Sequence, residues 1–91
     1  MQTVHLIISG KVQGVFFRET SRKIAEKLNI KGWIKNIPDE KVEALITGDE
    51  KDVSDFIKWC KTGPDRAKVK EVIVTKQPET FFDKFEVKRR E

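Results

Sequence analysis

Residues 9–18 read SGKVQGVFFR, and this stretch joins an apolar, strand-like run to the start of an amphipathic helix. Gly10 and Gly14 allow the backbone between them to turn its N–H groups toward a common point. The N-terminus of the following helix adds partial positive charge there, and Arg18 brings a planar fork of donors that suits phosphate oxygens. The stretch therefore predicts a strand–loop–helix unit whose loop binds an anion, and a small phosphorylated compound is the first ligand to consider.

Outward from this loop, the spacing of apolar residues predicts five strands and two helices. The strands are expected at residues 4–8, 33–35, 42–47, 69–75 and 85–87, and the helices at residues 18–28 and 52–61. Each helix carries one apolar stripe, formed by Phe17, Ile24, Ala25 and Leu28 around the small Ser21 in the first, and by Val53, Phe56, Ile57 and Cys60 in the second. Both helices are therefore expected on the same face of a sheet.

The order of these elements is β-α-β-β-α-β, followed by a short fifth strand. Crossover helices on either side of a central hairpin are typical of the split βαβ, or ferredoxin-like, arrangement. We therefore expect an α+β sandwich in which two helices cover one face of an antiparallel sheet, in a single domain spanning residues 1–91.

Composition narrows the class of protein further. The net charge is +4, with lysines spread along the whole chain, which favours anionic partners only weakly. No signal-peptide pattern and no apolar run long enough to span a bilayer is present, so we expect a soluble cytoplasmic protein without a membrane partner, and a monomer. Cys60 is the only cysteine, which excludes an internal disulfide.

A second group of landmarks follows the loop. Residues 32–36 read GWIKN, and further along come Val42-Glu43, Gly48, and Gly63-Pro64 with Ala67 and Val69. In this order and spacing, the loop and these landmarks resemble the acylphosphatase family over nearly the whole chain. The resemblance implies an enzyme that hydrolyses the carboxyl–phosphate anhydride bond of small acyl phosphates to a carboxylate and inorganic phosphate, with no metal and no organic cofactor.

The resemblance also implies roles for particular residues. Arg18 would clamp the phosphoryl oxygens, and Asn36 would hold the attacking water. The phosphoryl group would be bound by backbone N–H groups of the loop, those of Gln13, Gly14, Val15, Phe16 and Phe17. Inorganic phosphate or sulfate is expected to compete for the same loop.

One position departs from the family pattern. The turn after the asparagine usually reads Asp-Gly, whereas here it reads Asp39-Glu40. A left-handed Glu40 would cost on the order of 1 to 2 kcal/mol, unless the turn changes type. A shifted turn would also displace Asn36, because that residue lies just before the hairpin.

The residue types agree with an acyl phosphate as substrate. The one histidine, His5, lies in the first strand, and no cluster of His, Asp, Glu or Cys has the spacing of metal ligands. An acyl phosphate expels a carboxylate, which needs no proton at neutral pH, whereas an alkyl phosphate usually needs an acid or a metal. Asn36 cannot deprotonate water, so our hypothesis is that the phosphoryl group itself or solvent accepts the proton.

Two other readings belong to different classes of function. RNA-recognition modules share this architecture and stack bases on aromatic side chains of the first and third strands, but residues 4–8 and 42–47 contain no Phe, Tyr or Trp, so we expect no nucleic-acid partner. The alternative that remains is a non-catalytic phosphate- or anion-binding module of the same fold. Taken singly, Arg18 reads as a surface arginine and Asn36 as a turn residue, and only their motifs favour function.

Overall fold

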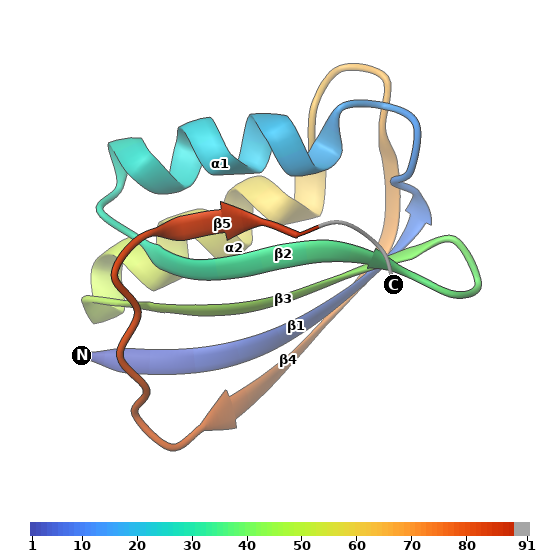
Figure 1. The fold of residues 1–91 in the computed structure, drawn as a ribbon. Coiled ribbons are helices and arrows are strands. Elements are labelled where there is room, and N and C mark those ends of the chain that lie inside the picture. Colours follow the sequence, from blue (N-terminus) through green and yellow to red (C-terminus); the bar gives the residue numbers. More distant parts are fainter. Residues whose placement is uncertain (89–91) are drawn as a thin grey trace.

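A computed structural model describes residues 1–88 as a five-stranded sheet with two helices packed on one face (Figure 1). The strands are β1 (Gln2–Lys11), β2 (Lys31–Ile37), β3 (Lys41–Gly48), β4 (Lys68–Gln77) and β5 (Phe85–Val87), and the helices are α1 (Phe17–Lys27) and α2 (Glu50–Thr62). The predicted element order and fold class are confirmed. Neither helix of residues 1–88 is long and apolar enough to cross a membrane.

The strands lie in the order β4-β1-β3-β2-β5. The four long strands pair antiparallel, as predicted, while β5 adds to the edge of the sheet in parallel with β2. β1 and β4 both extend beyond their predicted bounds. At one end, Ser9 to Lys11 continue the backbone ladder with residues 68–71, across an irregularity between Ser9 and Gly10. At the other end, Thr3 and Val4 pair with Gln77 and Lys76.

The hydrophobic core lies between the sheet and the helices. Alternate residues of the central strands face the helices and are almost fully buried: Val4, Leu6 and Ile8 of β1, and Val42, Ala44 and Ile46 of β3. The helices cover them with the predicted stripes, of which Phe17, Ser21 and Ala25 in α1 and Val53, Phe56 and Cys60 in α2 are buried. This packing fixes the start of α1, and with it Arg18, against the sheet.

The hairpin between β2 and β3 settles the question raised by the Asp39-Glu40 turn. Both residues are left-handed, with φ of 67° at Asp39 and 60° at Glu40. The strand register nevertheless runs without interruption from Lys31 opposite Thr47 to Ile37 opposite Lys41. The turn therefore absorbs the strain itself, and Asn36 keeps its regular place in β2.

Residues 78–84 carry the chain from β4 at one edge of the sheet to β5 at the other (Figure 1). Three threonines fasten this connection: the Thr80 N–H donates to Thr3 Oγ1 at 3.0 Å, Thr47 Oγ1 donates to the Thr80 carbonyl at 2.9 Å, and the Thr3 and Thr47 hydroxyl oxygens are 2.5 Å apart. This connection lets β5 pair with β2. Lys88, directly after β5, then lies close to Arg18 at the start of α1.

Candidate active site

The loop between β1 and α1 is held by alternating side chains. Val12, Val15 and Phe17 are buried in the core, whereas Gly14 and Phe16 between them are exposed. Gly14 and Phe16 both have left-handed backbones, with φ of 72° and 63°. The buried side chains thus fix a loop whose backbone turns sharply at Gly14 and at Phe16. The turn at Gly14 was predicted from the sequence, and the turn at Phe16 was not.

Gly10 shapes the entry to this loop for a different reason. Its φ is 120°, and a Cβ atom at this position would lie 2.2 Å from the carbonyl oxygen of Lys68 in β4. Only glycine allows the two backbones to approach this closely. Gly10 is therefore required by the β1–β4 contact, while Gly14, which has no neighbour within 4 Å of such an atom, is required by its φ alone.

The backbone N–H groups of residues 13–17 are available to a ligand. Within residues 1–88 none of them donates to a backbone carbonyl, and the residue preceding α1, Phe16, offers no side-chain cap. The first N–H groups of any helix lack intrahelical partners and carry partial positive charge. The loop and the N-terminus of α1 together present a group of donors suited to an anion.

Arg18 is half-buried in the first turn of α1. Its Nη1 donates to the carbonyl oxygen of Lys88, just after β5, at 3.2 Å. This is the one hydrogen bond that the Arg18 side chain makes within residues 1–88, so most of its five N–H donors remain for a ligand. The contact ties the guanidinium to the segment after β5, and Arg18 lines the same hollow as Asn36 of β2.

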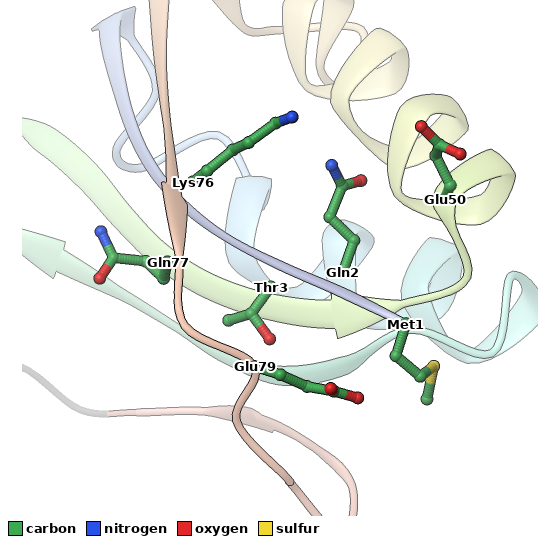
Figure 2. A pocket seen from close by; sticks show the side chains of 7 residues that line it. All are labelled: Met1, Gln2, Thr3, Glu50, Lys76, Gln77 and Glu79. Carbon is green, nitrogen blue, oxygen red and sulfur yellow. The ribbon is translucent and has the colours of Figure 1, made fainter.

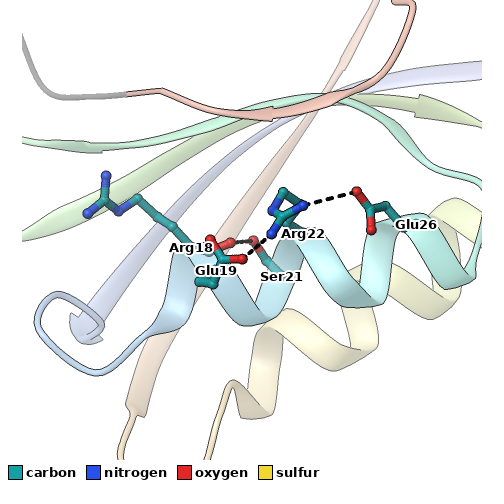
Figure 3. Close-up of polar contacts among 5 residues, drawn as sticks. All are labelled: Arg18, Glu19, Ser21, Arg22 and Glu26. Atoms are coloured by element: carbon teal, nitrogen blue, oxygen red, sulfur yellow. Dashed lines mark hydrogen bonds and ion pairs between the residues drawn. The ribbon is translucent and has the colours of Figure 1, made fainter.

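Arg18 stays apart from the ion pairs on the same helix. Figure 3 shows its guanidinium pointing away from Arg22, which pairs with Glu19 and, at 3.3 Å, with Glu26. The hydrogen bond from Arg22 lowers the pKa of Glu19, so this carboxylate stays ionised and engaged with Arg22. Glu19 therefore does not neutralise Arg18.

Asn36 lies in β2 opposite Val42 of β3. Like Ile34 two residues earlier, it faces the side of the sheet that the helices cover. It lies next to the loop, because both line one hollow. Its Oδ1 atom is buried and has no hydrogen-bond partner among the described residues. An unpaired buried acceptor is costly, and such atoms are most often satisfied by water or a ligand.

The side chain of Gln13 joins the loop to the hairpin that carries Asn36. Its Nε2 donates to the carbonyl oxygens of Ile37 at 3.0 Å and Lys41 at 2.8 Å. These two residues form the last pair of the β2–β3 ladder. Sequence reasoning assigned only the backbone N–H of Gln13 and missed this contact; a long amide side chain inside a loop of small and apolar residues was the available signal.

These elements enclose a hollow of about 340 Å³. Its lining includes Gly14, Phe16, Phe17, Arg18 and Asn36, so the structure brings both predicted side chains and most of the predicted loop together. Gln13 and Val15 do not line it: the first points to the hairpin, and the second packs into the core.

Other polar features lie away from this hollow. The Nε2 atom of His5 is hydrogen-bonded to Glu43 Oε2 at 2.7 Å. His5 lies between the buried Val4 and Leu6 in β1, so its side chain points to the opposite face of the sheet, which no helix of residues 1–88 covers. Figure 2 shows a separate depression near the start of β1, which is lined by Glu50 and Glu79 together with Lys76. Glu50 and Glu79 repel an anion, and in the described part of the chain this depression lacks the loop N–H groups and the arginine that line the first hollow.

Comparison with known proteins agrees with this geometry. The family model Acylphosphatase matches residues 4–87. A protein described as an acylphosphatase from Syntrophus aciditrophicus is 41% identical over 88 residues, covering 96% of this chain and 92% of the relative, and one from Rubrobacter xylanophilus is 44% identical over 75 residues, covering 82% and 68%. The crystal structure of acylphosphatase from Bacillus subtilis superimposes with a TM-score of 0.92 at 33% identity, covering 96% of this chain and 98% of that one. The chain belongs to the acylphosphatase family.

Proposed function

We propose that this chain hydrolyses the carboxyl–phosphate anhydride bond of small acyl phosphates, giving a carboxylate and inorganic phosphate, in the hollow between the loop and β2. The observation that carries the proposal is the convergence of three elements on that hollow: the loop N–H groups, Arg18 of α1 and Asn36 of β2. Their chemistry fits a phosphoryl group and a water molecule, and family membership supplies the reaction.

Arg18 and the N–H groups of residues 13–17 bind the phosphoryl oxygens in this proposal. Phosphoryl transfer passes through a loose transition state with charge spread over three equatorial oxygens, and positioned donors can therefore supply most of the catalysis. The guanidinium holds two oxygens at once because its N–H groups form a planar fork. The hydrogen bond to the Lys88 carbonyl supports this role because it fixes the direction of the fork before substrate arrives.

Asn36 orients the attacking water. Its buried, unpaired Oδ1 can accept a hydrogen bond from that water, leaving the water oxygen directed at phosphorus. The bond from water oxygen to phosphorus forms as the bond from phosphorus to the acyl oxygen breaks, and the carboxylate leaves with the electron pair. The proton of the water passes to a phosphoryl oxygen or to solvent.

The proposal extends to competing anions and to the state of the protein. Inorganic phosphate and sulfate share the tetrahedral oxygens that the loop would recognise, and both should compete with substrate. Action as a monomer in the cytoplasm is part of the proposal.

Hydrolysis of acetyl phosphate in water enriched in ¹⁸O tests the reaction and its direction of attack. If Asn36 directs water at phosphorus, enzyme-dependent turnover places the label in inorganic phosphate and leaves acetate unlabelled. Label in acetate would show attack at carbon and contradict the proposed geometry. A folded protein that binds phosphate without turnover would support the non-catalytic alternative instead.

A further inference from the structure

A second hollow adjoins the proposed phosphate site. It has a volume of about 400 Å³, within the range typical of small-molecule sites, and it lies between α1, the loop and the segment after α2. Its wall includes Val15, Thr20 and Pro64, together with Phe16 and Glu19, which also line the first hollow. The two hollows thus meet at Phe16 and Glu19.

Phe16 is held in an unfavourable position at this boundary. Its side chain is 73% exposed, although the neighbouring Val15 and Phe17 are buried. Its φ of 63° is left-handed, which costs on the order of 1 to 2 kcal/mol for a residue with a side chain. Left-handed backbones at residues other than glycine are enriched at functional sites.

The direction of the proposed reaction leads from the first hollow toward the second. The attacking water and the leaving group lie roughly in line on opposite sides of phosphorus. Asn36 lines the first hollow and not the second, whereas Phe16 lines both. A carboxylate that departs away from Asn36 therefore passes the Phe16 ring.

The lining of the second hollow also carries charged side chains of both signs. These are Lys23, Arg66, Glu19 and Asp65. Glu19 is, in addition, paired with Arg22. The apolar part of the hollow is formed by Val15, Phe16 and Pro64; Val15 is buried, whereas the Phe16 ring is exposed.

We infer that the second hollow is the binding site for the acyl group of the substrate, and that contact with the exposed Phe16 ring favours aryl acyl groups over small aliphatic ones. This inference rests on the proposed function. Aromatic rings gain from offset or edge-to-face contact in addition to burial of their area, so an aryl acyl group benefits more than a methyl group. Phe16 is then a specificity-determining residue whose side chain serves the acyl group and whose backbone serves the phosphoryl group.

The test compares benzoyl phosphate with acetyl phosphate as substrates of the intact chain. Phe16→Ala should lower the ratio of their kcat/KM values by about tenfold, mainly through a higher KM for benzoyl phosphate. Any disturbance of the loop N–H groups affects both substrates and cancels in the ratio. Phe16→Tyr keeps a ring and should retain the wild-type ratio.

Two further variants make the test decisive. Phe81→Ala removes a ring that is 85% exposed but lies in residues 78–84, away from the hollow, and should leave both substrates unaffected. Phe16→Gly removes the ring while relieving the left-handed strain, so it covers the case in which the alanine variant folds poorly. An unchanged ratio in both folded Phe16 variants would overturn the inference while leaving the proposed function intact; hydrolysis of neither substrate by the wild-type protein would overturn both.

Discussion

Arg18 owes its position to a residue that is distant in sequence. The carbonyl of Lys88 takes one N–H of the guanidinium, and the remaining donors face the hollow. Arg18→Ala should lower kcat/KM for an acyl phosphate by about 10² to 10³, because a major donor to the transition state is lost. Arg18→Lys should recover little of this, since lysine keeps the charge but loses the planar fork. Steady-state kinetics on folded variants check both expectations, and a wild-type rate in Arg18→Ala would show that the site is assigned wrongly.

Gln13 is expected to act as a positioning residue through its side chain. Gln13→Glu has the same size but can no longer donate to the carbonyls of Ile37 and Lys41. The loop is then no longer held to the hairpin that carries Asn36, so the two can shift relative to each other. A misplacement of this kind can cost about 10²-fold in kcat. Gln77→Glu, the same change at an exposed position at the end of β4, is the matched control. Equal kinetics in the two variants would remove Gln13 from the account.

Among single residues, Arg18, Asn36 and the loop residues could be predicted from the sequence because each belongs to a short, contiguous motif. The Gln13 contacts and the Arg18–Lys88 hydrogen bond could not be predicted in the same way. They join residues separated by 24 to 70 positions, and depend on how the hairpin and β5 meet the loop. Only the assembled sheet brings those partners together.

At the level of elements, the β2–β3 hairpin carries a cost that can be removed. Glu40→Gly should stabilise the protein by about 0.5 to 1 kcal/mol, since relief of the left-handed strain exceeds the added entropy of the unfolded chain. Urea unfolding measures the change, and activity should persist because the register of Asn36 is already regular. Lys58→Gly on the exposed side of α2 is the contrasting control and should destabilise by about 1 kcal/mol. A destabilised Glu40→Gly would mean that Glu40 makes a compensating contact.

The hairpin and β5 also show what element-level prediction missed. Apolar spacing located both, but the sequence left open whether the Asp39-Glu40 turn would shift the strands, because strain and a change of turn type have similar costs. It also gave no direction for β5, since three residues with one buried side chain, Phe85, fit either edge and either orientation. The threonine-fastened connection of residues 78–84 decides that direction.

For the whole molecule, the buried thiol of Cys60 provides a measure of core integrity. Burial raises the pKa of this thiol in the folded protein, whereas an unfolded cysteine ionises near its ordinary pKa of about 8.5. Its contribution to stability is therefore fully present below about pH 8.5 and is lost as pH rises above that value, at up to about 1.4 kcal/mol per pH unit. The stability advantage of the thiol over the alanine of Cys60→Ala should therefore fall as pH rises above about 8.5, approaching this slope near pH 10. A pH-independent difference would indicate that the thiol ionises in the folded state.

The measurement that tests the account most directly is hydrolysis of benzoyl phosphate by the purified protein in the presence of a chelator, beside Arg18→Ala and Asn36→Ala. We expect steady, chelator-independent loss of substrate by the wild type and a fall on the order of 10² or more in both variants. Asn36→Ala should still bind inorganic phosphate, because the loop and Arg18 are intact. Absence of hydrolysis by the folded wild type, or full activity in either variant, would contradict the claim that Arg18, Asn36 and the loop form one catalytic site.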